Sequence, residues 1–181
     1  MCHSNYYRIR QLKQIRQYLA FDSAKTQVHY FVTSRVDYCN SLLASAPVYQ
    51  TDQLQRVLNV AAHLLLRVPR FDLDLRVKIK NRLHWLHVLE RVTFKLCTLV
   101  YKSPHDSAPW YLVELCNPVA SDCYRQNLRS AGNNELIVPR QKLSTYGPRS
   151  FEIPDPVAWN PLPQHLTNDE LSYEWFLSGL K

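Results

Sequence analysis

Apolar residues recur at steps of three and four along the first half of the chain, the spacing that places them on one face of an α-helix. Such stripes occupy segments 9–19, 24–32, 54–65 and 89–100. Isolated amphipathic helices are marginal in water, because most of their stability comes from packing the apolar face. The pattern therefore predicts a helical bundle. The longest stripe consists of Leu54, Val57, Leu58, Ala61, Leu64 and Leu65.

Basic residues fall between the apolar positions, where a helix faces water or a ligand. Those off the first stripe, within the predicted helix 6–19, are Arg8, Lys13 and Arg16, and those off the third are Arg56 and Arg67.

Capping and helix-breaking residues predict the helix boundaries. Asp22 is expected to cap the second helix, and Pro47 to stop a helical pattern that continues through residues 38–43. Thr51 is expected to open the third helix and Pro69 to close it. These boundaries place short connections between the helices.

The segment 70–82 is ambiguous, because Leu75, Val77 and Ile79 alternate as in a strand. A short helix is the alternative, and we favour it. Residues 88–102 predict a further amphipathic helix, and Pro109 is expected to open a short helix in its first turn.

The pattern changes after residue 115. Residues 116–134 are polar and predict a linker, whereas 135–139 and 149–153 predict two short strands joined by a turn at Tyr146. The proline-rich segment 154–166 predicts bends. Asn168 is expected to cap a last helix with Leu171, Trp175 and Leu180 on its apolar side. The predicted fold is mainly α: a helical bundle at 6–115, a linker at 116–134, and a small α+β annex at 135–181.

Charge adds a functional expectation to this fold. The 181-residue chain carries a formal net charge of +7. Residues 51–100 hold nine lysines and arginines against four acidic residues, whereas residues 151–181 hold one lysine against five acidic residues. A basic body favours an anionic partner, and RNA or DNA is the partner we expect. An ordinary solvated basic surface is the alternative.

The candidate phosphate-binding residues lie mostly in one basic stretch between residues 67 and 82. With Arg56 they are Arg67, Arg70, Arg76, Lys78, Lys80 and Arg82, and a smaller patch around Tyr146 consists of Arg140, Lys142 and Arg149. Trp85 follows the stretch and could stack on a base, but a place in the core is the interpretation that we favour.

No residue pattern predicts catalysis or a cofactor. Asp72 and Asp74 could face one metal ion, but they lie between Arg70 and Arg76, so salt bridges are expected instead. The chain has no G-x-S-x-G nucleophile motif. His84, His87, Cys97, Cys116 and Cys123 lack the close Cys-x-x-Cys pairs of structural zinc sites, and we expect no metal.

The cysteines and the apolar runs bear on location. Five cysteines at irregular spacing, without a secretory signal sequence, favour reduced thiols and an intracellular protein, nuclear or cytoplasmic. No apolar run approaches the roughly 20 residues that cross a bilayer, so no membrane partner is expected.

A series of short strings resembles one protein family. They occur in the order found downstream of the polymerase domain of LINE-type (non-LTR) retrotransposon reverse transcriptases. They are FVTSRVDYCNSLL (31–43), LQRVLNVAA (54–62), LHWL (83–86), RVTFKL (91–96), APWYL (108–112), LRS (128–130), VPR (138–140), TYG (145–147) and WNPLP (159–163). The chain departs from the family pattern at His87, at Pro148 and at residues 153–156.

The resemblance implies the C-terminal region of such a protein. The family's catalytic aspartates and its endonuclease lie upstream and are absent here, so neither activity carries over. That region is expected to help hold template RNA and target DNA. The alternative is a structural or protein-interaction module that docks on the upstream polymerase domain or is reused by a host.

Overall fold

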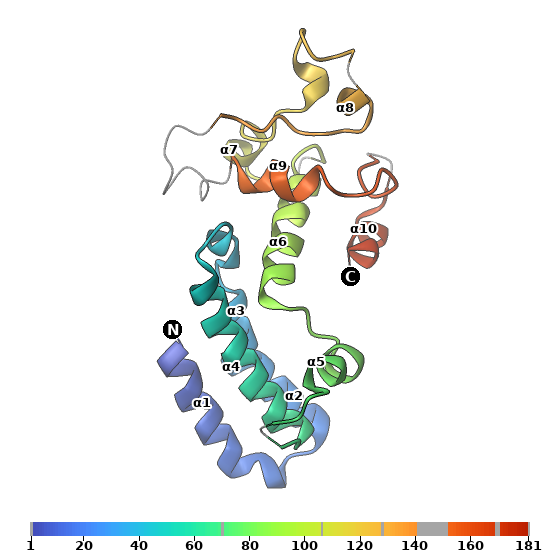
Figure 1. The fold of residues 1–181 in the computed structure, drawn as a ribbon. Coiled ribbons are helices and arrows are strands. Elements are labelled where there is room, and N and C mark those ends of the chain that lie inside the picture. Colours follow the sequence, from blue (N-terminus) through green and yellow to red (C-terminus); the bar gives the residue numbers. More distant parts are fainter. Residues whose placement is uncertain are drawn as a thin grey trace. The chain divides into compact units, whose positions relative to one another are not determined.

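Helices dominate the structure, a computed structural model that describes residues 2–69, 71–105, 107–127, 129–140, 152–168 and 171–180 (Figure 1). The predicted mainly α fold is confirmed. Two compact units are present: unit 1 comprises Met1–Asn40 and Ala46–Arg91, and unit 2 comprises Ser41–Ser45 and Val92–Lys181. The division thus falls inside a helix, between Arg91 and Val92, whereas the sequence analysis expected a boundary near residue 115.

Unit 1 is a bundle in which the longest helix, α4, lies against α1, α2 and α5. A π-helical turn (His29–Thr33) joins α2 to α3, and another (Ile79–Leu83) follows α5. The α-helices of the unit are α1 (Cys2–Ile15), α2 (Phe21–Val28), α3 (Ser34–Asp37), α4 (Val48–Leu66) and α5 (Leu75–Lys78).

The core of unit 1 is aliphatic and follows the predicted stripes. Its buried residues are Ile9, Leu12, Ala24, Val28, Val32, Val57, Ala61, Ala62, Leu65, Leu66 and Leu83. Three stripe residues of unit 1 depart from the prediction, because Ile15, Phe31 and Leu89 are exposed. Trp85 is half-buried and packs against this cluster, which agrees with the core interpretation.

Two of the predicted helix starts are wrong. Ala20, not Asp22, precedes α2, and no side chain caps that helix. The helix α4 begins at Val48, directly after Pro47, instead of at Thr51. Thr51 is buried in the first turn, where its hydroxyl donates a hydrogen bond of 2.9 Å to the Val48 carbonyl. A helical residue can satisfy its hydroxyl in this way, so a threonine does not by itself mark a helix start.

The other end of α4 precedes the expected proline. The helix stops at Leu66 because Arg67 adopts the left-handed conformation with φ of 53°. The chain reaches Pro69 only afterwards and then enters α5, which confirms the favoured helix within 70–82. The π-helical turn after α5 likewise ends at a left-handed residue, His84, with φ of 56°.

Unit 2 is built around most of helix α6 (Val88–Lys102), whose predicted bounds are confirmed. Short helices follow it: α7 (Trp110–Val113), α8 (Arg129–Gly132), α9 (Pro154–Trp159) and α10 (Tyr173–Gly179). Its core contains an aromatic cluster, in which Tyr101 stacks on Phe176 with ring centroids 4.4 Å apart and Trp159 lies against the same phenylalanine.

The two predicted strands are not seen in the described residues of unit 2. Residues 135–139 form one isolated bridge, between Leu136 and Pro118. The Asn160 side chain takes the place of a second strand: it accepts a hydrogen bond of 2.9 Å from the Leu136 N–H and donates one of 3.0 Å to the Leu136 carbonyl. Of the other predicted strand, residues 152–153 form a turn and 149–151 lie outside the described residues.

Two further expectations for the C-terminal half are wrong. The segment 154–166 begins with a helix, α9, because Pro154 occupies a first-turn position that needs no backbone N–H. The last helix starts after Ser172 and not after Asn168. This shift changes the buried face: Phe176 is fully buried, whereas Trp175, predicted on the apolar side, is 73% exposed.

Candidate nucleic-acid interface

The basic stretch of unit 1 displays most of its cations to solvent. Arg67, Arg76, Lys80 and Arg82 are exposed, and none of them forms an ion pair within the described residues. Arg56 is exposed on α4, eleven residues before Arg67, which places it about three turns away on the same face of the helix. Arg70 lies outside the described residues.

Lys78 is the neutralised member of the stretch, because its ammonium forms an ion pair with Asp72. The hydrogen bond from Lys78 is the largest of the influences that lower the pKa of Asp72, and the Asp74 N–H adds a bond of 3.0 Å to its other oxygen. The salt bridge expected for Asp72 is therefore present, but its partner among the described residues is Lys78 and not Arg76.

The second predicted patch is described only at Arg140, which is exposed and belongs to unit 2. Lys142 and Arg149 lie outside the described residues.

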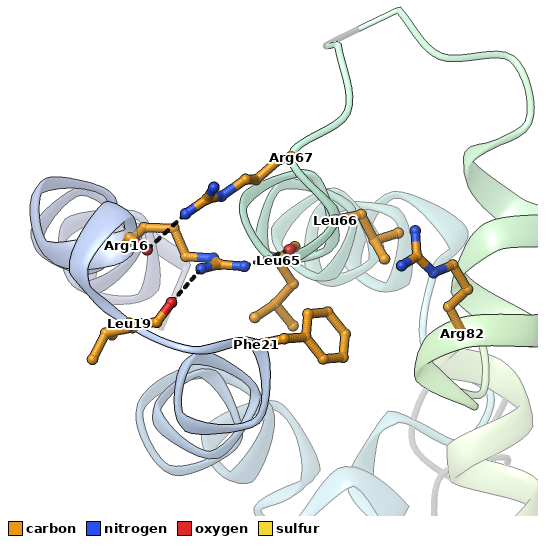
Figure 2. Close-up of a pocket in the computed structure, with 7 residues that line it drawn as sticks. All are labelled: Arg16, Leu19, Phe21, Leu65, Leu66, Arg67 and Arg82. Atoms are coloured by element: carbon orange, nitrogen blue, oxygen red, sulfur yellow. Dashed lines mark hydrogen bonds between the residues drawn. The ribbon is translucent and has the colours of Figure 1, made fainter.

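Arg67 and Arg82 meet at a surface pocket of about 310 Å³ at the C-terminal end of α4, which we call the arginine pocket (Figure 2). Arg67 comes from the end of α4 and Arg82 from the π-helical turn that follows α5. The complete lining is Arg16, Leu19, Phe21, Leu65, Leu66, Arg67 and Arg82.

Arg16 is fixed at the pocket by backbone carbonyls. Its Nε, Nη1 and Nη2 donate hydrogen bonds of 3.3, 2.9 and 3.0 Å to the carbonyls of Leu64, Leu19 and Leu65. The last carbonyls of a helix lack intrahelical partners and carry partial negative charge, so Arg16 satisfies the end of α4. Arg67 in turn donates a bond of 3.3 Å to the Arg16 carbonyl.

This arrangement leaves a concentrated positive charge. Arg16 is only 8% exposed, and no carboxylate among the described residues pairs with it. Burial lowers the pKa of Arg16, and the positive charge of Arg67 lowers it further. A nearby anion would counter both effects, because negative charge favours the charged form of a guanidinium.

A second pocket, of about 260 Å³, shares Arg16 and Arg67 with the arginine pocket. Lys13, Gln17, His63 and Leu64 complete its lining. The Nδ1 atom of His63 is buried, and no described residue forms a hydrogen bond with it. Arg16 and Arg67 therefore lie between two basic pockets.

Sequence reasoning missed Arg16 and Lys13 as site residues. Both fall off the apolar stripe of the first helix, as the sequence analysis noted, and nothing local sets Arg16 apart. The 3₁₀ turn at Arg16–Tyr18 lies directly after α1, and Arg16 is buried there against the end of α4.

Other chemistry is not assembled in the parts of the chain that the structure describes. They contain no group of three or more His, Cys, Asp or Glu residues placed to hold a metal ion. Burial, and after it the charge of Asp155, raises the pKa of Cys97 to about 12, so at neutral pH its thiol is protonated and is no nucleophile. Among the described helices, none combines the length and apolar character needed to span a bilayer.

Comparisons with protein families, with curated proteins and with solved structures found no match for this chain. The resemblance to LINE-type reverse transcriptases therefore stays a prediction from the quoted strings.

Proposed function

We propose that this chain is a non-catalytic nucleic-acid-binding module, corresponding to the region downstream of the polymerase domain of a LINE-type reverse transcriptase. The observation that carries the binding proposal is the arginine pocket, which Arg16, Arg67 and Arg82 line without an acidic partner among the described residues. The family proposal is supported by the ordered strings between residues 31 and 163.

Phosphate is the anion that best fits this surface. Arg76 and Lys80 extend the exposed positive charge along α5 and the turn after it, so a chain of phosphates meets more of these cations than a single carboxylate does. Each phosphate that a cation neutralises releases condensed counterions, and binding therefore weakens with salt. Guanidinium groups also match phosphate oxygens through paired N–H donors.

Binding to RNA and DNA, single-stranded and duplex, tests the proposal by fluorescence anisotropy between about 50 and 200 mM salt. The variant Arg76→Glu/Lys80→Glu is compared with Lys95→Glu/Arg125→Glu, which makes the same charge change at exposed positions of unit 2. The first variant is expected to flatten the slope of log affinity against log salt by roughly 1.4–1.8, the contribution of two phosphate contacts. The second is expected to leave the slope unchanged.

A protein-interaction module is the second candidate, and exposed aromatic residues on α1 and after it favour it. Tyr7 and Tyr18 are 55% and 80% exposed, and Ile15 of the predicted stripe is 47% exposed. Size-exclusion chromatography with light scattering separates the two candidates. Self-association of a chain that binds none of the four nucleic acids would support this second candidate and overturn the first.

A further inference from the structure

The arginine pocket has two kinds of wall. Arg67 and Arg82 supply charge at its rim, while the half-buried side chain of Phe21 supplies apolar surface in front of the buried Leu65 and Leu66. In Figure 2 the ring of Phe21 lies beside Leu65, below the guanidinium of Arg16. A site for inorganic phosphate alone does not need an aromatic wall.

Phe21 is held in place by the fold. It is the first residue of α2, it is half-buried, and it packs against the aliphatic core of unit 1. The bond from Arg16 to the Leu19 carbonyl fixes the segment just before it. The aromatic wall is therefore already ordered before a ligand binds.

We propose that the arginine pocket is a subsite for one unpaired nucleotide, whose phosphate binds at the arginine rim and whose base packs on Phe21. The inference rests on the proposed nucleic-acid binding and adds the class of ligand. Arg16 is a positioning residue, because its guanidinium already binds three carbonyls and its charge adds to the field of the site. The volume of about 310 Å³ lies at the lower end of the range for small-ligand pockets, as a single nucleotide requires.

The two sources of such a nucleotide are a single strand and a free mononucleotide. The pocket favours the strand, because the second pocket continues the basic surface on the other side of Arg16 and Arg67. A duplex offers phosphates to the same arginines but keeps its bases paired and stacked, so it cannot place a base against Phe21.

The unmodified protein provides the first test. Affinities are measured at one salt concentration for a ten-nucleotide uridine RNA, the matching abasic strand, a ten-base-pair duplex and uridine monophosphate. The uridine strand is expected to bind at least about fivefold more tightly than the abasic strand, the lower end of what one base stacked on an aromatic side chain contributes. Tighter binding of the strand than of the mononucleotide assigns the site to nucleic acid, and the reverse order overturns the strand as its ligand.

Phe21 variants provide the second test. Phe21→Leu keeps an apolar side chain in the core and is expected to lose about the same factor on the uridine strand, with less than a twofold change on the abasic strand and the duplex. Phe21→Trp keeps a ring and is expected to retain affinity. Thermal unfolding followed by circular dichroism confirms that each variant is folded.

The outcomes separate this inference from the proposed function. Equal binding of the uridine and abasic strands overturns the nucleotide subsite and leaves a phosphate-binding surface. An equal loss on all ligands in Phe21→Leu also overturns it, because the ring then acts only through the fold. Failure of the unmodified protein to bind any of these ligands overturns both proposals.

Discussion

The two units differ in the hydrogen bonds that surround a buried ionisable side chain. In unit 1, Arg16 is 8% exposed, and three backbone carbonyls accept its hydrogen bonds. In unit 2, Asp155 is 1% exposed, and neither carboxyl oxygen has a hydrogen-bond partner in the described part of the chain. Burial raises the pKa of Asp155 to about 8. The three hydrogen bonds stabilise the charged form of Arg16, whereas no described residue offsets the burial of Asp155.

The two buried side chains therefore have different roles, functional for Arg16 and structural for Asp155. Arg16 stays charged and, with Arg67, supplies the positive field of the arginine pocket. Asp155 lies near the buried thiol of Cys97, whose pKa its charge raises, and it is protonated at neutral pH. The first group can attract an anion, whereas the second makes unit 2 sensitive to pH.

The largest expected effect is on the stability of unit 2, through Asp155→Asn. The folded-state pKa of about 8 lies above the ordinary value of 3.8, so unfolding releases a proton between these values. The free energy of unfolding should therefore be highest below about pH 4 and fall by up to about 1.4 kcal/mol per pH unit up to about pH 8. Asp155→Asn removes this titration and should be several kcal/mol more stable than the unmodified chain at pH 8.

Urea unfolding at intervals between pH 5 and 8, followed by the near-ultraviolet signal of Trp159 and its neighbours, measures this dependence. Glu152→Gln is the matched control, because Glu152 is an exposed carboxylate in the same unit. A slope that persists in Asp155→Asn would show that another group titrates.

The next largest effect is expected from Arg16→Ala in unit 1. The substitution leaves the carbonyls of Leu64 and Leu65 at the end of α4 without their charged donor. Hydrogen bonds to a charged group contribute roughly 1.5–3 kcal/mol, so a loss of about 3 kcal/mol is expected. Hydrogen exchange of the last amides of α4 should accelerate. Lys13→Ala, an exposed neighbour, should change stability by less than about 0.5 kcal/mol, and an equal loss there would argue against a cap.

The contrast between the units also shows what the sequence could predict. Helical periodicity is local, so it identified the stripes around Leu54 and Val92 and gave the bounds of α6. Helix starts were less predictable, since Thr51 and Asp22 are good caps that these helices do not use. Capping is one of several ways to satisfy the first N–H groups, and a helix that packs well can begin without it.

The parts that could not be predicted depend on residues far apart in the chain. Arg16 meets α4 across 48 and 49 residues, and no local pattern signals that pairing. Asn160 meets Leu136 across 24 residues and removes the need for a second strand. The exposed basic stretch was visible in the sequence. That Arg16, Arg67 and Arg82 line one pocket, however, can be seen only in the folded structure.

Asn160→Ala should have an intermediate effect, confined to unit 2. It removes both hydrogen bonds to the backbone of Leu136, which is buried. A buried N–H or carbonyl left unsatisfied costs about 1–3 kcal/mol, and we expect a loss of about 2 kcal/mol in urea unfolding. Asn117→Ala is the control, because Asn117 is exposed and its side chain bonds only a nearby carbonyl. Equal losses in the two variants would indicate that Asn160 does not replace a strand.

The smallest effect sharpens the comparison of the two carboxyls. Asp72 in unit 1 is paired with Lys78, and that bond is the first cause of its lowered pKa. Asp155 in unit 2 has no partner among the described residues, and burial raises its pKa. In a carbon-13 NMR titration the carboxyl of Asp72 should therefore titrate below the ordinary pKa of 3.8 and that of Asp155 above it. Lys78→Met should move the pKa of Asp72 up toward its ordinary value and leave that of Asp155 unchanged.

The same substitution, Lys78→Met, should weaken RNA binding less than Arg82→Met, because Lys78 already has an acidic partner and Arg82 has none among the described residues. Equal losses of affinity would mean that the acidic partner does not withhold Lys78 from phosphate.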